Sequence, residues 1–232
     1  MLNVEKHALK KIQHLFRKSS QLVTPYLPNR QAIHARKRWE SQWATLDFPP
    51  HWRTQEIPEI LQEALDQQWF TPGSNLLDIG CGSGECANWL AQQGFSVLGI
   101  DFAPSAIRRA QATYPEHEGL HFRVLDICQN VPTQTFNTLF DRGCFHIIPS
   151  SQRPQYVQQV ARAAKPNAHF LLLHRIWGTR EKSLPLDELA NRSQPIVSQI
   201  QRDFTRLFEI ICTQPISYPD RKPDVAVWMV RR

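Results

Sequence analysis

Short apolar segments alternate with helical segments from residue 75 onward, and this order limits the fold more than any other feature of the sequence. Segments that are apolar throughout are typical of strands buried on both faces, and their alternation with helices is typical of a parallel sheet. We therefore predict an α/β fold with a doubly wound, Rossmann-like, mostly parallel sheet of seven strands. The first five predicted strands are "NLLDI", "SVLGID", "LHFRVLD", "TFNTLFD" and "AHFLLLH", and the helices between them cover 83–93, 104–115 and the region around Tyr156.

The last two predicted strands differ from the others in how they are connected. The proline-rich stretch "PISYPDRKP" alone separates "LFEIICTQ" from "DVAVWMV", and a weaker helical pattern at 196–204 precedes them. A connection without room for a helix does not suit a parallel crossover. We therefore expect these two strands to pair antiparallel at the edge of the sheet.

The positive charge of the chain is concentrated near its N-terminus. Residues 1–40 contain nine Lys and Arg and two Glu, a net charge of +7, whereas the remainder has 18 basic and 19 acidic residues. Within this segment, 5–18 places Leu9, Ile12 and Phe16 on one side of a predicted helix. A basic amphipathic helix suits either a membrane surface or a site on its own domain, and we favour the second.

The cysteines indicate a reducing compartment. Five cysteines are an odd number, and none of them forms a CxxC pair. This usage favours free thiols over a disulfide framework or a metal site. The N-terminus lacks the apolar core of an export signal, so we expect a cytoplasmic protein without a bound metal.

The stretch "LLDIGCGSGE", 76–85, follows the first predicted strand and predicts a ligand site. Glycines at this point allow a ligand to approach the backbone at the start of a helix. The spacing is GxGxG rather than the GxGxxG of dinucleotide-binding proteins, and Glu85 stands where the third glycine would be. No GK[ST] follows, which excludes a P-loop. A carboxylate here favours a cationic or zwitterionic ligand over a pyrophosphate.

Two further acids end the next two predicted strands. Asp101 ends "SVLGID", where a carboxylate can accept hydrogen bonds from both ribose hydroxyls, and Asp126 ends "FRVLD", where it suits the exocyclic amine of adenine. Each alone is compatible with a helix cap. Three acids at consecutive strand ends, beside a glycine turn, instead favour a ligand with an adenosine and a charged amino-acid end.

This arrangement resembles that of the class I methyltransferases that use S-adenosylmethionine, and the resemblance begins at about residue 75. It implies that "LLDIGCGSG" surrounds the methionine half of that cofactor, that Asp101 binds the ribose and that Asp126 and Ile127 contact the adenine. The residues that the resemblance implies for cofactor binding are Asp78, Gly80, Cys81, Gly82, Gly84, Asp101, Phe102, Asp126, Ile127 and Asp141.

The segment "DRGCFHIIPSSQRPQY", 141–156, narrows the resemblance. It is similar to the corresponding segment of the thiopurine methyltransferase family and its thiol-, halide- and tellurite-methylating relatives at Asp141, Arg142, Gly143, Ile147 or Ile148, Pro149, Arg153 and Tyr156. The tryptophan-rich stretch with Trp39 and Trp43 resembles the N-terminal lid that members close over the cofactor, and these rings are candidates to stack on adenine or the acceptor. We therefore divide the chain into a basic extension, 1–35, and a methyltransferase domain, 36–232.

The resemblance implies a small-molecule acceptor rather than a nucleic acid, because nucleobase amine methyltransferases usually carry [DN]PP[YFW] where this chain has "FDRG". The leading hypothesis is methyl transfer to a thiol or other soft nucleophile, which needs little base. The alternative is O- or N-methylation of a specialised metabolite, with His146 or His174 as general base. Arg153 is the candidate contact to the acceptor. A structural role remains the alternative for each of these three residues.

Overall fold

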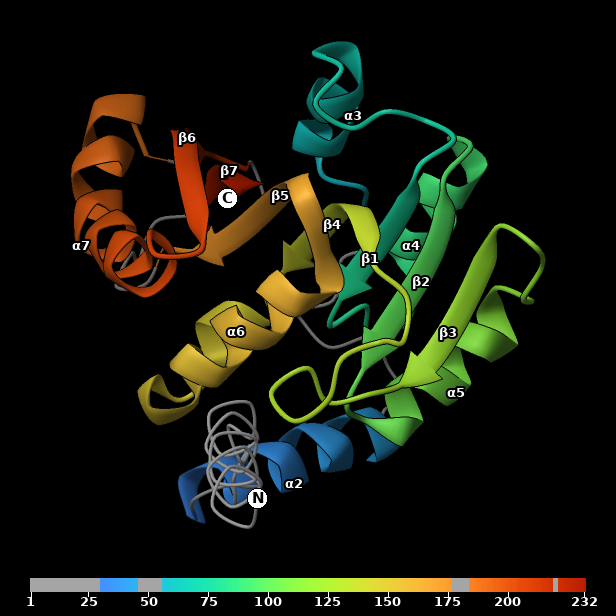
Figure 1. The fold of residues 1–232 in the computed structure, drawn as a ribbon. Coiled ribbons are helices and arrows are strands. Elements are labelled where there is room, and N and C mark those ends of the chain that lie inside the picture. The colour runs from blue at the N-terminus through green and yellow to red at the C-terminus, as the bar shows by residue number, and fades with distance from the viewer. Residues whose placement is uncertain (1–29, 46–55, 177–183, 219–220) are drawn as a thin grey trace, which may run out of the picture.

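A single seven-stranded sheet forms the centre of the molecule in the computed structural model, which describes residues 30–45, 56–176, 184–218 and 221–232. The strand order is β3-β2-β1-β4-β5-β7-β6 (Figure 1). The strands are β1 (Asn75–Ile79), β2 (Ser96–Asp101), β3 (Leu120–Val124), β4 (Phe136–Arg142), β5 (Ala164–Arg175), β6 (Phe208–Ile216) and β7 (Asp224–Arg231). The predicted doubly wound sheet is therefore confirmed.

The last strand is the one that reverses direction. β7 pairs antiparallel with both β5 and β6, whereas the pairs among β1 to β5 are all parallel. The predicted antiparallel pairing of the last two strands is thus confirmed. Because β7 is inserted between β5 and β6, β6 forms the edge.

Helices cover both faces of the sheet. They are α2 (Arg30–Thr45), α3 (Glu59–Asp66), α4 (Glu85–Gln92), α5 (Pro104–Thr113), α6 (Arg153–Ala163) and α7 (Leu186–Phe204). Apolar side chains of α3, α4 and α5 form a core with one face, and those of α6 and α7 form a second core with the other. In the described part of the chain, no helix combines the length and the apolar character needed to cross a bilayer.

Helix α7 is longer than the predicted helix at 196–204. It begins ten residues earlier, at Leu186, and continues through Pro195. A proline inside a helix costs about 3 kcal/mol because it removes one backbone hydrogen bond. The buried stripe of Leu189, Val197, Ile200 and Phe204 offsets that cost by packing on the sheet.

Helix α2 crosses the end of the molecule at which β1, β2 and β3 finish (Figure 1). Trp43 on this helix is buried against Ala103 and Ala106 at the start of α5. The helix runs through the boundary predicted between residues 35 and 36. The predicted amphipathic helix at 5–18 lies outside the described residues.

Candidate functional site

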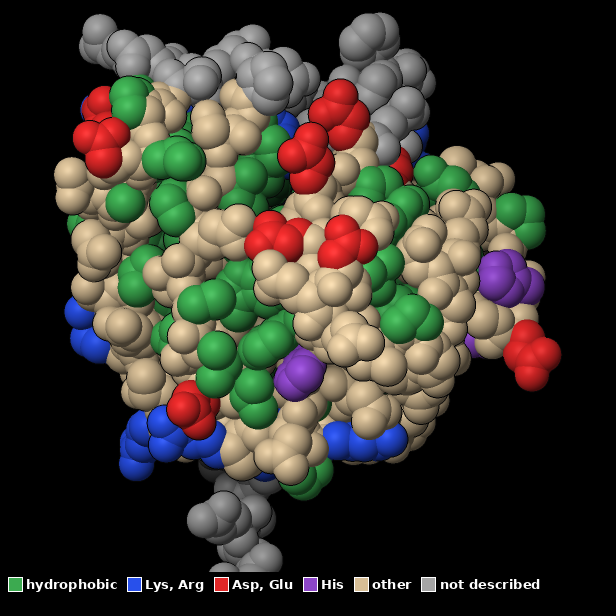
Figure 2. Space-filling model, turned by 90° about the horizontal axis from the view of Figure 1, so that it is seen from above, with side chains coloured by type: hydrophobic (Ala, Val, Ile, Leu, Met, Phe, Trp, Pro, Cys, Tyr) green, Lys and Arg blue, Asp and Glu red, His purple; other side chains and the backbone are tan. Residues whose placement is uncertain are grey.

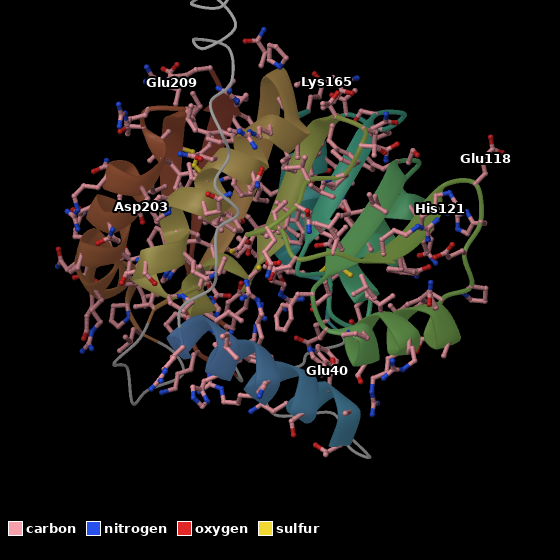
Figure 3. All side chains as sticks on the ribbon, turned by 60° about the horizontal axis from the view of Figure 1, so that its bottom comes forward. Glu40, Glu118, His121, Lys165, Asp203 and Glu209 are labelled. Carbon is pink, nitrogen blue, oxygen red and sulfur yellow. The ribbon has the colours of Figure 1, made fainter. Side chains whose placement is uncertain are left out.

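A cavity of about 640 Å³ lies at the carboxyl ends of the parallel strands, beneath α2. This is the position at which doubly wound sheets bind ligands. Its lining comes from α2, from the turns after β1, β2, β3 and β4, from the end of β5 and from the residues leading into β7. Figure 3 shows the molecule with the α2 end turned forward.

The glycine turn after β1 forms part of the wall. Gly80 and Gly82 line the cavity and have φ values of 72° and 56°, which favour glycine. A Cβ at Gly80 would lie 2.6 Å from the Cβ of Cys144, and one at Gly82 would lie 3.0 Å from the ring of Trp43. The close approach that requires glycine is therefore made by the chain's own side chains. The sequence had suggested that a ligand makes it.

Two other predicted residues of this turn lie away from the cavity. Gly84 has a φ of 88°, and a Cβ there would lie 2.8 Å from the ring of Phe122. Neither Gly84 nor Cys81 belongs to the described cavity lining. Their predicted contact with a cofactor is thus not supported, since both positions serve the packing of the turn.

Asp101 lies where the sequence predicts a ribose-binding acid. Its side chain is buried and lines the cavity. One carboxylate oxygen accepts a hydrogen bond from the backbone N–H of Gly82 (3.2 Å) and the other from that of Ala103 (2.9 Å). Burial raises the pKa of Asp101 to about 6, against the opposing effect of these two hydrogen bonds. Each oxygen retains a lone pair for a hydroxyl in the cavity.

Asp78 is buried behind the glycine turn. Its Oδ2 atom has no hydrogen-bond partner among the described residues. Burial, and then the neighbouring Asp141, raise the pKa of Asp78 to about 8. Glu85, at the start of α4, accepts a hydrogen bond from the Ser83 hydroxyl. A cation bound near the turn would favour the ionised form of Asp78.

Asp126 lines the cavity but already has partners for both oxygens. Oδ1 accepts from the backbone N–H of Cys128 (2.9 Å), and Oδ2 lies 2.5 Å from the Arg36 guanidinium. Gln129 also donates to Oδ2. An adenine amine at Asp126 would therefore compete with Arg36 of α2 for the same carboxylate oxygen.

Asp141, for which the resemblance implies a cofactor contact, holds a turn next to the cavity. It is fully buried and is absent from the described lining of the cavity. Its carboxylate accepts hydrogen bonds from the backbone N–H groups of Cys144 and Phe145 and from the Tyr156 hydroxyl. Burial raises its pKa to about 7, with these hydrogen bonds acting in the opposite direction. Asp141 thus holds the turn that brings Cys144 and His146 to the cavity.

The two candidate histidines are neighbours, but only one faces the cavity. His146 lines it, whereas His174 is buried behind it with its ring 5.5 Å from that of His146. Nδ1 of His146 accepts from the backbone N–H of Arg175 (3.4 Å), and Nδ1 of His174 lies 2.8 Å from the carbonyl oxygen of Arg175. Burial, then the charges of His174, Arg175 and Arg153, lower the pKa of His146 to about 3. Burial lowers that of His174 to about 4.

Arg153 also departs from its predicted place. It is not one of the described cavity residues. Its Nε donates to the carbonyl of Ile148, its guanidinium lies 5.0 Å from the centre of the Phe145 ring, and it approaches Asp203 of α7 at 3.9 Å. These contacts place Arg153 between the turn after β4 and α7, which suits a structural role.

The remaining predicted cofactor residues are brought together as expected. Trp39, Trp43, Phe102 and Ile127 all line the cavity. The two tryptophans come from α2, and the other two residues follow β2 and β3. Large apolar and aromatic side chains that line one cavity are typical of sites that hold a flat ring.

The sequence did not single out the basic residues of the cavity. Arg142 ends β4, Arg175 ends β5, and Arg221 and Lys222 lie just before β7. The strand-end rule that identified Asp101 could also have identified Arg142 and Arg175. Arg221 and Lys222 join them only because β7 is antiparallel, which brings its beginning to the same edge of the sheet.

The residues around the glycine turn fit S-adenosylmethionine. Asp78 has an unpartnered buried oxygen atom among the described residues, and Asp101 faces the cavity. Carboxylates suit a sulfonium, an ammonium and ribose hydroxyls, and they disfavour the phosphates of a dinucleotide. Asp101, Phe102, Ile127, Trp39 and Trp43 would hold this cofactor.

Relatives in sequence agree with this geometry. The chain is 37% identical over 129 residues to 2-heptyl-1-hydroxyquinolin-4(1H)-one methyltransferase of Mycobacteroides abscessus, an alignment that covers 54% of this chain and 55% of the relative. It is 27% identical over 138 residues to thiocyanate methyltransferase 1 of Arabidopsis thaliana, covering 58% and 60%. The chain thus spans a little over half the length of these curated relatives.

Solved structures share the fold. A methyltransferase of Anabaena variabilis described as dependent on S-adenosylmethionine aligns with a TM-score of 0.67 and 19% identity, over 90% of this chain and 97% of the other. The N-methyltransferase NodS of Bradyrhizobium japonicum, solved with S-adenosyl-L-homocysteine, aligns with a TM-score of 0.65 and 15% identity, over 85% and 98%.

A sequence model of thiopurine S-methyltransferase matches residues 34–176, which contain most of α2, the glycine turn, Asp101, Asp126 and the DRG turn. The match covers more than half of the chain and includes most of the cavity. This protein therefore belongs to the thiopurine S-methyltransferase family of S-adenosylmethionine-dependent methyltransferases.

Proposed function

We propose that this chain transfers a methyl group from S-adenosylmethionine to a small acceptor that is an anion at neutral pH, with a thiolate as the first candidate. The proposal rests on the division of charge across the cavity. The acids Asp101 and Asp126 lie at the ends of β2 and β3, on one side, where Arg36 of α2 pairs with Asp126 and leaves Asp101 as the acid without a cationic partner in the described lining. The bases Arg142, Arg175, Arg221 and Lys222 belong to β4, β5 and the start of β7, on the other side.

The basic side keeps an excess of positive charge after its internal pairing. Arg175 is paired with Asp224 at 2.7 Å, the acidic residue of the lining on that side. Burial, and then the nearby charge of Arg142, lower the pKa of Arg221. Nε of Arg221 has no hydrogen-bond partner within the described residues. An anion in the cavity would satisfy this donor and relieve the repulsion between the guanidinium groups.

The division of charge separates the two reactants. When bound, S-adenosylmethionine would supply a methyl group on a sulfonium, and the acceptor anion would bond to that methyl carbon in line as the carbon–sulfur bond breaks and S-adenosylhomocysteine leaves. Asp101 binds and orients the nucleoside end, and the rings of Trp39 and Trp43 exclude water from it. Arg142 and Arg221 orient the anionic acceptor on the other side. Holding both partners in line accounts for most of the acceleration in such a reaction.

The neutral state of His146 agrees with an anionic acceptor. With a pKa of about 3, its imidazole is a weak base at neutral pH. An acceptor that has already lost its proton requires no base. His146 then contributes an N–H or ring surface to the acceptor side rather than proton removal.

An acidic N-hydroxyl group is a second candidate acceptor. The relative at 37% identity is named for a 1-hydroxyquinolin-4-one, and another is named for thiocyanate, which is an anion. The two named compounds differ in chemical class, but both are compatible with an acceptor that enters as an anion.

An acceptor panel tests the proposal. The purified chain is incubated with S-adenosylmethionine and an aromatic thiol, thiocyanate, a 1-hydroxyquinolin-4-one, a neutral alcohol or a primary amine, and S-adenosylhomocysteine and methylated product are measured by mass spectrometry. We expect turnover with the first three classes. A clear preference for the amine or the neutral alcohol would refute an anionic acceptor.

A matched pair of variants tests the basic side. Arg221→Gln removes a cavity cation, whereas Arg192→Gln removes an exposed arginine of α7 that pairs with Glu188. We expect Arg221→Gln to raise KM for the anionic acceptor by about 10-fold or more, the effect of a lost charged hydrogen bond. Arg192→Gln should behave as the wild type. Equal KM values in all three proteins would contradict the acceptor assignment.

A further inference from the structure

Helix α2 is held on the domain by a carboxylate that binds the start of another helix. Oε1 of Glu40 accepts a hydrogen bond from the Ser105 hydroxyl (2.6 Å), and Oε2 accepts one from the Ser105 backbone N–H (3.2 Å). Arg108 lies 3.9 Å from the same carboxylate and donates to the Ser105 hydroxyl. A negative charge at the N-terminal turn of a helix is favourable because the backbone N–H groups there lack partners within the helix.

The turn that Glu40 binds also carries the predicted nucleoside site. Asp101 and Phe102 line the cavity, and Asp101 accepts from the N–H of Ala103, two residues before Ser105. Two carboxylates, one from β2 and one from α2, thus bind successive N–H groups at the start of α5. Glu40 lies on the side of α2 that faces α5 (Figure 3).

Glu40 is also placed to orient the two cavity tryptophans. Trp43 follows Glu40 by three residues, so these two side chains are neighbours on α2, and Trp39 is a neighbour of Trp43 by its i, i+4 spacing. The Trp43 ring lies over Gly82, where it leaves no room for a Cβ. The backbone carbonyl of Trp43 accepts a hydrogen bond from Arg109 of α5. This bond holds the end of α2 to α5.

We propose that Glu40 is a positioning residue for S-adenosylmethionine: by joining α2 to the start of α5, it fixes the tryptophan wall against the turn that carries Asp101. The inference rests on the proposed function, since the ligand positioned is the methyl donor. Glu40 acts through Trp39, Trp43 and Asp101, with its own carboxylate occupied by Ser105.

Two measurements on the full chain test this role. Amide hydrogen exchange without any ligand reports whether α2 is held, and calorimetry with S-adenosylmethionine reports the affinity. Glu40→Gln removes the charge and keeps the side-chain length. We expect about 10-fold faster exchange of α2 amides and about 10-fold or weaker binding, the range for a charged hydrogen bond. KM for the acceptor should change much less than the Kd of the methyl donor.

Two further variants separate positioning from general damage. Glu188→Gln makes the same substitution on the surface of α7, where Glu188 pairs with Arg192, and it should leave both readouts unchanged. Ser105→Ala removes the hydroxyl partner of Glu40. The double variant Glu40→Gln/Ser105→Ala should bind S-adenosylmethionine no more weakly, and exchange its α2 amides no faster, than Glu40→Gln alone. The reason is that both changes break the same contact.

The outcomes distinguish this inference from the proposed function. If the wild type binds S-adenosylmethionine and Glu40→Gln binds it with the same Kd, the inference about Glu40 is overturned and the proposed function is not. This holds whatever the exchange rates are. Strictly additive effects in the double variant overturn it as well. If the wild-type chain does not bind S-adenosylmethionine at all, both the proposed function and the inference are overturned.

Discussion

Asp78 shows how one buried carboxyl can oppose stability. Its pKa is about 8 in the folded chain and near the ordinary value of 3.8 when exposed. The folded state therefore binds more protons than the unfolded state between these values, and the contribution of Asp78 to stability falls as the pH rises from about 4 to about 8.

The variant Asp78→Asn should therefore gain stability relative to the wild type as the pH rises. We expect its melting temperature to exceed that of the wild type by at least about 2–4 °C at pH 8.5, equivalent to about 1 kcal/mol for a chain of this length. The difference should shrink toward pH 4, and binding of S-adenosylmethionine should weaken. Thermal melts over this pH range are the measurement, and parallel curves for the two proteins would contradict the raised pKa.

His146 leads to a prediction about the pH dependence of catalysis. Because its pKa is about 3, its protonation state does not change between pH 5 and 9. His146→Gln should lower kcat by less than about 10-fold, whereas removal of a general base costs about 10²–10⁴-fold. It should also leave the shape of the pH–rate profile unchanged. A larger loss together with a missing acidic limb would restore the general-base hypothesis.

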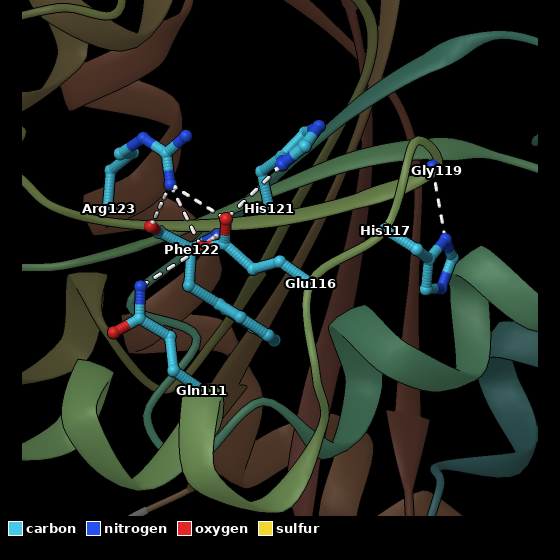
Figure 4. A network of polar contacts seen from close by, with 7 residues as sticks. All are labelled: Gln111, Glu116, His117, Gly119, His121, Phe122 and Arg123. Atoms are coloured by element: carbon cyan, nitrogen blue, oxygen red, sulfur yellow. Dashed lines mark hydrogen bonds and ion pairs between the residues drawn. The ribbon is translucent and has the colours of Figure 1, made fainter.

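At the scale of elements, the edge strand β3 is closed by a side chain. Glu116 lies in the loop before β3 and accepts from the backbone N–H of Phe122 and from Arg123 and Gln111, with His121 nearby (Figure 4). An open strand edge invites pairing with another chain, and an occupied N–H prevents it. Burial acts to raise the pKa of Glu116, but the hydrogen bonds outweigh it and lower the pKa to about 2.

A lowered folded pKa means that Glu116 stabilises the chain above about pH 4.5, and that this contribution is lost as the pH falls toward 2. Glu116→Gln should lower the melting temperature at pH 7 by about 2–4 °C, which corresponds to about 1 kcal/mol for a partly exposed charged hydrogen bond. Glu118→Gln, two residues along the same loop, is the control. If the melting temperature of Glu116→Gln lies as far below that of the wild type at pH 2.5 as at pH 7, the charge of Glu116 is not the source of the stabilisation.

At the scale of the whole molecule, the two ends of the sheet differ in their chemistry. The carboxyl ends of the parallel strands converge on the charged cavity. The face seen from above in Figure 2 shows small groups of hydrophobic side chains among polar ones, with Lys and Arg mainly toward its margins. Because α2 is joined by charged contacts to the segments that follow β2 and β3, ligand binding should stabilise the domain as a unit.

S-adenosylmethionine at 100 times its Kd should stabilise the folded chain by about 2.7 kcal/mol, which raises the melting temperature by about 5–10 °C. Asp101→Ala should weaken binding by roughly 1–3 kcal/mol. At the same ligand concentration, it should then lose between about a third and nine-tenths of that rise. Thermal melts with and without the ligand measure both effects, and an equal rise in the two proteins would remove Asp101 from the nucleoside site.

Local patterns were sufficient for the order and type of the elements. The alternation of apolar and helical segments from residue 75, and the short link before β7, depend on neighbours along the chain and required no knowledge of contacts. The glycine turn, Asp101 and Asp126 could be placed for the same reason, since each ends a strand of one parallel sheet.

Contacts between distant segments decided the rest. Asp141 and Arg153 were assigned to the site on pattern alone, but Asp141 holds the turn before α6 and Arg153 lies between that turn and α7. Arg221 reaches the cavity only because β7 runs in reverse, and Arg36 reaches Asp126 only because α2 lies over the strand ends. The sequence by itself thus determined the sheet and the acidic side of the cavity, since both follow from local periodicity. Which side chains form the basic side was decided by tertiary structure, because it depends on how segments far apart in the chain pack together.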